Sequence, residues 1–182
     1  MAFAYFYFDF NDEQKQLVRS LVCALIIQLS RRDSSVPDSL AALYSHCLDG
    51  QHKPTLGSLM NVLREIASSF SQTYIVLDAL DECKEQEELL PLIGDLTEWG
   101  IVGLHILATS RPEPMIKGHL ATRISDTVDL HNASVDQDIR VHIQHQLQND
   151  HRMSKWQLPI KEEIEISLMK GANGMYTRFF AI

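Results

Sequence analysis

The sequence has 182 residues, of which 45% are hydrophobic and 22% charged, a composition typical of a folded domain rather than a disordered chain. The formal net charge of -8 disfavours a nucleic-acid-binding or membrane-binding surface, and no stretch reaches the ~18 apolar residues of a membrane span. Three cysteines without CxxC spacing favour a reducing compartment, so we expect a cytoplasmic protein.

Apolar periodicity predicts strands alternating with helices. It predicts strands at 3–10, 74–78, 104–109 and 125–130. Between the first three strands it predicts helices at about 12–32, 39–47, 55–70 and 85–98, and after the last strand it predicts helices at about 134–148 and from 159. The first strand is apolar on both faces, which predicts helices on both sides of the sheet. The closing apolar run, 174–182, is expected to begin a further helix. The pattern indicates an α/β fold with a parallel sheet between two helical layers.

Carboxylates follow the central predicted strand. Asp78 would be its last residue, and Asp81 and Glu82 would lie in the loop just beyond it. At the carboxyl end of a parallel strand such acids commonly face a cation or a phosphate. The simpler alternative is that they cap the helix that follows, because acids favour helix N-termini. Three acids within five positions favour the ligand site.

A second polar group, Thr109-Ser110-Arg111, follows the next strand. Parallel neighbouring strands would bring both groups to one edge of the sheet. A cation ligand, acids that orient water and an arginine that meets a phosphate together suit phosphoryl transfer. Taken alone, Arg111 is better interpreted as a surface ion pair with Glu113 or another nearby acid.

These segments resemble a known family. Ile75-Val76-Leu77-Asp78-Ala79-Leu80-Asp81-Glu82-Cys83 resembles the Walker B segment of NACHT-type signal-transduction (STAND) P-loop NTPases, and Ile106 to Pro112 resembles their sensor 1 strand. The likeness is to fungal NOD-like receptors and to nephrocystin-3-like N-terminal domains. Residues 4–10 resemble the strand that follows their P-loop helix, and residues 171–176 resemble their Gly-Met-Phe entry to the next helix.

The resemblance implies a role for each site residue. Asp78 would hold Mg²⁺ through water, and Asp81 and Glu82 would be the catalytic acids that polarise the attacking water. Thr109 and Arg111 would belong to the nucleotide site, with Arg111 sensing the γ-phosphate. Ala79 replaces the glycine that the family often has at this position.

The sequence departs from the family in lacking a P-loop. That motif, G-x-x-x-x-G-K-[ST], cradles phosphates with backbone amides and a lysine. None of the eight glycines in this chain is followed by lysine. By the resemblance the motif would lie before residue 1. We therefore expect an incomplete NACHT-type domain over 1–182, truncated before the P-loop strand, with an α/β core at 1–131 and a helical part at 132–182.

The function implied is a nucleotide switch that carries Walker B and sensor 1 without Walker A. In the complete protein we expect ATP and Mg²⁺ as cofactors and ATP hydrolysis as the reaction. In this chain alone we expect neither nucleotide binding nor hydrolysis. Effector and repeat domains would be its protein partners, with oligomerisation in the complete protein. One alternative is a degenerate scaffold that binds proteins and has lost nucleotide chemistry. Another is an independent hydrolase, disfavoured because three close acids alone bind Mg²⁺ weakly.

The missing P-loop strand also predicts a defect in the sheet. Strands 3–10, 74–78 and 104–109 should form a parallel core with 74–78 in the middle. In the family the P-loop strand lies between the sensor 1 strand and the last strand, here 125–130. Its absence would leave a gap of about twice the usual ~4.8 Å spacing, with 125–130 loosely held or moved into the empty position.

Overall fold

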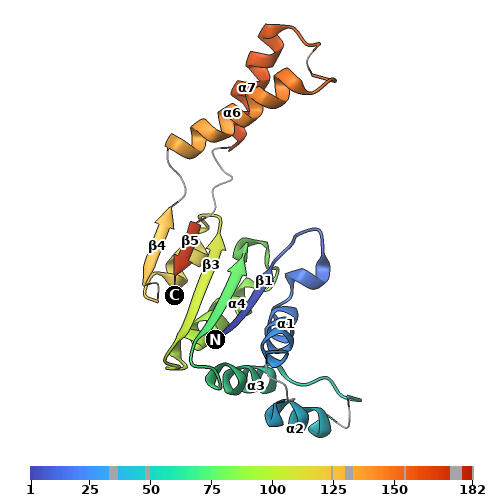
Figure 1. Cartoon of the computed structure of the whole chain (residues 1–182), viewed down its shortest axis with the longest axis vertical. Helices are drawn as coiled ribbons and strands as arrows, with labels where there is room; N and C mark the ends of the chain where they lie inside the picture. The colour runs from blue at the N-terminus through green and yellow to red at the C-terminus, as the bar shows by residue number, and fades with distance from the viewer. Residues whose placement is uncertain are drawn as a thin grey trace.

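The computed structural model describes residues 1–32, 37–47, 50–123, 125–129, 133–153, 155–172 and 178–181, with the backbone alone at 129, 133–135, 171–172 and 178–181. The chain forms an α/β body built on a five-stranded sheet of order β1-β2-β3-β5-β4. A hairpin of two helices, α6 and α7, projects from the body beyond the carboxyl ends of the parallel strands (Figure 1).

Three parallel strands form the centre of the body. They are β1 (Ala2–Tyr7), β2 (Thr73–Asp78) and β3 (Leu104–Ser110), and β2 lies between the other two. The register aligns Ala4 with Ile75 and Ile75 with Ile106. The predicted parallel core, with 74–78 in the middle, is confirmed.

The helices between these strands match the predicted ones closely. The chain from β1 to β2 forms the 3-10 turn η1 (Glu13–Gln16), then α1 (Val18–Ser30), α2 (Asp38–His46) and α3 (Leu56–Ser68). The chain from β2 to β3 forms the 3-10 turn η2 (Leu80–Glu82) and α4 (Gln86–Glu98). The Thr55 side chain caps α3 by accepting from the Ser58 N–H at 3.1 Å. The single helix expected from 12 to 32 is interrupted at Leu17, whose backbone is extended.

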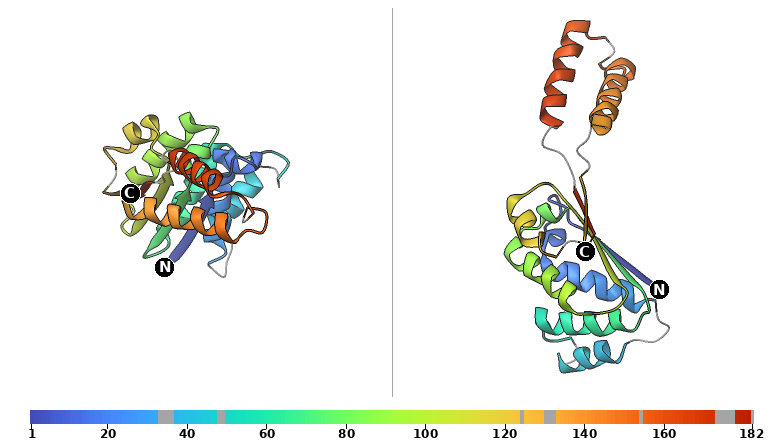
Figure 2. Two further views of the ribbon diagram at one scale, coloured as in Figure 1. Left: turned by 90° about the horizontal axis from the view of Figure 1, so that it is seen from above. Right: turned by 90° about the vertical axis from the view of Figure 1, so that its left-hand side faces the viewer.

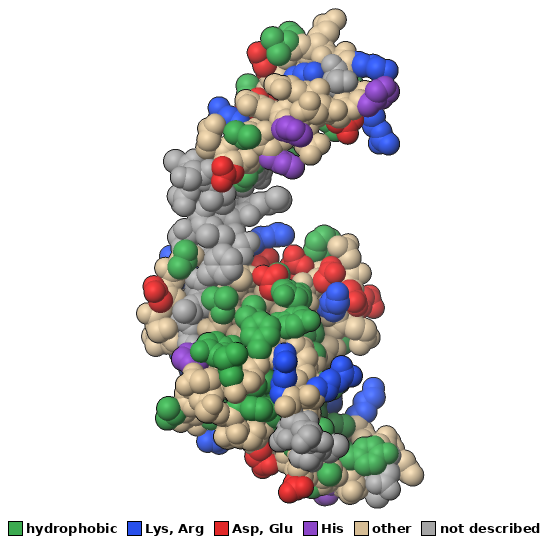
Figure 3. Space-filling model, in the orientation of Figure 1, with side chains coloured by type: hydrophobic (Ala, Val, Ile, Leu, Met, Phe, Trp, Pro, Cys, Tyr) green, Lys and Arg blue, Asp and Glu red, His purple; other side chains and the backbone are tan. Residues whose placement is uncertain are grey.

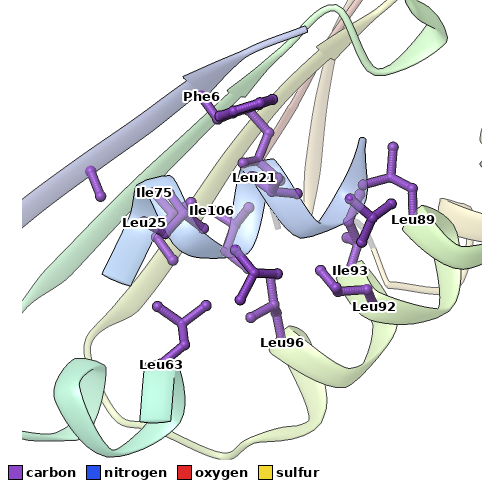
Figure 4. Close-up of a cluster of buried hydrophobic side chains, with 14 of the residues drawn as sticks. Phe6, Leu21, Leu25, Leu63, Ile75, Leu89, Leu92, Ile93, Leu96 and Ile106 are labelled. Carbon is purple, nitrogen blue, oxygen red and sulfur yellow. The ribbon is translucent and has the colours of Figure 1, made fainter. Parts of the chain in front are cut away.

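The hydrophobic core lies between one face of the sheet and α1, α3 and α4. Side chains at alternate strand positions point into it and meet the apolar faces of these helices (Figure 4). The largest fully buried side chains are Leu21, Leu25, Leu29, Leu63, Ile75, Leu77, Leu80, Leu89, Ile93, Leu96, Ile116 and Leu120. Full burial of such a side chain contributes about 1.5–3 kcal/mol, so this layer supplies most of the stability of the body.

Helices were expected on both faces of the sheet, and those of the described body cover only one (Figure 2, right). The strand order explains this difference. From β1 to β2 to β3 the chain advances across the sheet in one direction, and right-handed crossovers in one direction place their helices on the same side. The α/β class and the helix-flanked parallel core are therefore confirmed, while a second helical layer is not found in the described part of the chain.

The position beside β3 is occupied, contrary to the predicted gap. β5 (Arg178–Ala181) pairs with β3 in the antiparallel direction, and β4 (Asp126–Asp129) pairs antiparallel with β5 on its other side. β4 therefore runs parallel to β3, one strand further out. The prediction of a helix over 174–182 is wrong for 178–181, which form a strand. Phenylalanine has a high β-propensity, and the backbone edge of β3 is free to pair with this segment. Residues 174–177 and 182 lie outside the described ranges.

Three further helices complete the described fold. The short α5 (Pro114–Leu120), which the sequence reading missed, starts with proline at its first position and packs against α4. α6 (Ala133–Asn149) and α7 (Leu158–Ala172) pack on each other. Ile160 and Leu168 of α7 have the helical spacing that favours an inward-facing stripe, yet they are exposed because the hairpin does not lie on the body.

Candidate functional site

The ends of β2 and β3 are joined by Asp78 and Thr109. The Thr109 hydroxyl donates to Asp78 Oδ1 and accepts from the backbone N–H of Ala79 at 3.0 Å. Because β2 and β3 are parallel and in register, these two side chains emerge side by side at the carboxyl edge of the sheet. Among the described residues no group hydrogen-bonds Asp78 Oδ2, so this oxygen is available to a ligand.

Asp81 connects the loop after β2 to the end of β3. Its Oδ1 accepts from the Arg111 backbone N–H at 2.9 Å and from the Ser110 hydroxyl at 3.3 Å, while Oδ2 lies 3.4 Å from Arg111 Nε. The Asp81 side chain is only 8% exposed. Both carboxylate oxygens are therefore used by the neighbouring strand end.

Glu82 completes the cluster by reaching the segment after β1. Its Oε2 accepts from the Phe10 backbone N–H at 2.9 Å, and its Oε1 lies 3.8 Å from an Arg111 guanidinium nitrogen. Arg111 thus pairs with two acids, and its side chain remains 49% exposed. The alternative partner suggested by the sequence, Glu113, is not the one that it contacts in the structure.

A strained turn sets the positions of the two acids. Ala79 has left-handed backbone angles (φ 56°, ψ 53°), the conformation that favours glycine. It reverses the chain directly after Asp78, so that η2 begins there and Leu80 points into the core. The anchored Leu80 leaves Asp81 and Glu82 directed toward Arg111.

The segment after η2 is tied to the start of α1. The Cys83 thiol donates to the Gln16 carbonyl oxygen at 3.4 Å, and Glu85 Oε2 accepts from the Val18 N–H at 2.8 Å, which satisfies one of the free amides at the start of α1. Burial raises the pKa of the Cys83 thiol to about 11. Sequence reasoning missed Gln16 and Glu85 as supporting residues, and only the acid-rich run 81–88 gave a hint of the second.

The donor set fits Mg²⁺ only in part. Mg²⁺ is commonly held by one or two carboxylates, several waters and substrate phosphates. Asp78 with its free oxygen suits such a site, whereas Asp81 and Glu82 already hold Arg111. The described residues include no cluster of three or more His, Cys, Asp or Glu side chains that could hold a metal ion.

The fold and the site together define an α/β domain with a polar cluster where parallel strands end. Comparison with protein families shows which one it is. Residues 1–111 match the model of the nephrocystin 3 N-terminal family, and because the match covers more than half of the chain, the protein belongs to that family. Comparison with curated proteins and with solved structures found no match. In the described part of the chain no helix is long and apolar enough to cross a membrane.

Proposed function

We propose that this chain is the metal-binding and phosphate-sensing half of a NACHT-type nucleotide switch that acts on ATP. The observation that carries the proposal is the pairing of two strand ends, Asp78 with Thr109 and Asp81 with Arg111, at the edge where α/β sheets bind ligands. Family membership supports it, because the matched region ends at Arg111.

Each side chain has a distinct task in this proposal. Asp78 would orient a water ligand of Mg²⁺ through its free oxygen, with Thr109 fixing the carboxylate. Mg²⁺, when bound, supplies positive charge that neutralises the phosphates. Arg111 would move from the acids to the γ-phosphate, which leaves Asp81 and Glu82 able to polarise water. The Arg111 side chain is half exposed, so this movement needs no opening of the core.

The phosphate cradle has to come from outside these residues, since the chain has no G-x-x-x-x-G-K-[ST] motif. Catalysis of phosphoryl transfer is mostly positioning, so this chain alone should release no phosphate from ATP above background. The proposed setting is a cytosolic protein with effector and repeat domains that oligomerises when complete. The three free cysteines are consistent with a reducing compartment.

The test uses a longer form of the protein that includes the segment upstream of Met1. With a P-loop present, Asp78→Asn should weaken Mg²⁺-dependent binding of a fluorescent ATP analogue at least tenfold. Glu82→Gln should leave binding within twofold and slow phosphate release at least tenfold. Asp95→Asn is the matched control, since Asp95 is an exposed acid on α4 away from the cluster. Equal loss of binding in both site variants, with turnover per bound nucleotide unchanged, would refute the assigned roles.

A second candidate is a scaffold without nucleotide chemistry. The acids and Arg111 already satisfy one another, and β5 fills the position beside β3. On this reading Asp81 is a structural link between strand ends. Asp81→Asn would then lower the free energy of unfolding by about 1–3 kcal/mol, and no ATP binding would appear in any longer form of the protein.

A further inference from the structure

A groove runs between α3 and α4 on the helical side of the sheet. Its volume is about 730 Å³, and residues of both helices line it. Figure 2, right, shows the helical layer beside the sheet, and Figure 3 shows the other side of the sheet, where hydrophobic side chains gather over the strands. A crossover from a strand beyond β3 back to β1 would place its helix on that other side. Such a helix would leave the groove uncovered.

The floor of the groove is apolar and belongs to the core. Leu92 of α4 is only 4% exposed, and Leu56, Met60 and Trp99 are partly buried and pack against the core cluster. Gly57 leaves the α3 wall open, because a Cβ at this position would meet no atom within 4 Å. The floor is therefore a preformed surface that apolar side chains of a partner can contact.

The α4 rim of the groove is a row of acids, which we call the acidic row. Glu88, Asp95 and Glu98 stand at positions i, i+7 and i+10 and so lie on one helical face, and Glu87 lines the groove beside them. Glu98 pairs with Arg123 at 3.1 Å. Among the described residues no lysine, arginine or histidine forms a salt bridge with Glu87, Glu88 or Asp95. The acidic row therefore carries negative charge that the body does not neutralise.

A backbone acceptor lies in the same row. Pro91 lies inside α4, and its ring nitrogen has no hydrogen to donate to the Glu87 carbonyl oxygen one turn earlier. On the opposite rim, Arg64 Nη2 donates to the Trp99 carbonyl oxygen at 3.2 Å, so this cation is directed to the end of α4. Carboxylates and a carbonyl without its helical donor favour a partner that carries positively charged N–H donors.

We propose that this groove binds a basic amphipathic helix of a partner protein. The acidic row extends over roughly 15 Å with the spacing of helical turns, so a helix lying along α4 would bring a lysine or arginine to it every three to four residues. The apolar side chains of that helix would contact the floor, together with the aliphatic stems of its basic residues. The proposal is independent of nucleotide binding, because no residue of the groove belongs to the polar cluster at the strand ends.

Fluorescence of Trp99 reports occupation of the groove. The chain has two tryptophans, so Trp156→Phe leaves Trp99 as the single tryptophan emitter. The probe is an acetylated and amidated peptide of about 15 residues, built of lysine, alanine and leucine with leucine along one helical face. Its addition should shift Trp99 emission to shorter wavelength, with half-saturation below about 100 µM at low salt. Higher salt should weaken the binding, because charge pairing at an exposed rim is screened.

Variants separate the charge of the groove from its shape. Glu88→Gln/Asp95→Asn should weaken binding at least tenfold. Glu13→Gln/Glu65→Gln, which removes the same charge from two exposed acids outside the groove, should leave binding within twofold. Gly57→Arg places bulk and positive charge on the α3 wall without a clash at its Cβ, and should also weaken binding at least tenfold. Circular dichroism of each variant checks that the fold is kept.

Three results would overturn the proposal. One is constant Trp99 emission up to about 1 mM of the lysine peptide, well above the affinity expected. Another is an equal shift with a peptide that carries glutamate in place of lysine, since apolar contact alone would then explain the binding. The third is binding of a labelled lysine peptide, seen by fluorescence anisotropy, that the groove variants leave unchanged, because the peptide would then occupy another surface. A shift specific to the lysine peptide and lost in both groove variants supports it.

Discussion

The α/β body and the α6–α7 hairpin bury very different amounts of apolar side chain. In the body, three helices close one face of the sheet over a large core. In the hairpin, Leu147 is the one described hydrophobic side chain that is fully buried, while Val141, Leu158, Ile160, Ile166 and Leu168 are at least half exposed or close to it. The helices of the hairpin are held partly by polar contacts, since Gln144 Nε2 lies 3.0 Å from both oxygens of Glu165. The body should therefore be the more stable of the two regions, and the hairpin should open at a much lower free energy.

The largest expected contrast comes from one leucine in each region. Leu63→Ala should lower the free energy of unfolding by about 2–5 kcal/mol, because Leu63 of α3 is fully buried in the hydrophobic core. Leu168→Ala should change it by less than about 0.5 kcal/mol. Urea unfolding of both variants measures the difference, and equal losses would show that the hairpin packs on the body in solution.

A glycine of the body gives the next largest effect. Gly103 has φ +89°, and a Cβ there would lie 2.5 Å from the Ser71 carbonyl oxygen, so Gly103→Ala should cost about 2–3 kcal/mol. Gly57→Ala is the matched control, because a Cβ at Gly57 in α3 meets nothing within 4 Å; this variant should be neutral or more stable by up to about 1 kcal/mol. Thermal unfolding followed by circular dichroism measures both.

Removing the polar link should affect the hairpin alone. Glu165→Ala removes the bonds from Gln144 and the ion pair with Arg140, whose atoms lie 3.8 Å apart, and should cost the hairpin about 1 kcal/mol. Amides of α6 and α7 should then exchange roughly fivefold faster, with amides of β2 unchanged. Faster exchange in both regions would contradict the separation of the two.

The smallest effect is expected at the strained turn of the candidate site. Ala79→Gly should stabilise the body by about 0.5–1 kcal/mol, because glycine adopts the left-handed conformation without steric cost. Urea unfolding measures the gain, and Ala67→Gly, within α3, is a control that should destabilise. A loss of stability in Ala79→Gly would show that the alanine methyl group is needed in the turn.

Local patterns predicted the elements and the neighbourhood of the site. The apolar run before Asp78 and the one before Thr109 each indicate a buried strand, and parallel neighbours necessarily bring those residues to one edge. The start of the helix predicted at 55 is likewise a local feature, because the Thr55 side chain caps α3 within its own first turn. Because Asp81 and Arg111 follow neighbouring parallel strands, they lie near each other at this edge. That Arg111 pairs with Asp81 and Glu82 and not with Glu113 depends on the backbone conformation of the Ala79 turn.

Features decided by the whole sheet were not predictable in this way. The apolar positions of Phe3, Tyr5 and Tyr7 predicted a covering layer of helices, but strand order fixed the side on which the helices lie. The run containing Phe179 and Phe180 suits a helix or a strand, and the unpaired edge of β3 decided in favour of a strand. Ile160 and Leu168 have the helical spacing of a buried stripe, yet spacing cannot tell whether another element comes to cover them.

The buried Cys83 thiol makes the candidate site suitable for chemical labelling. With a pKa of about 11, roughly one thiol in ten thousand is ionised at pH 7, and only the thiolate attacks an alkylating reagent at a useful rate. Alkylation of Cys83 therefore has to wait until the segment after η2 separates from Gln16 and its thiol regains an ordinary pKa. The rate of Cys83 modification, measured by mass spectrometry of the peptide that contains it, therefore reports how often this loop opens. Any ligand that holds the loop closed will lower that rate, and the ligand itself needs no label.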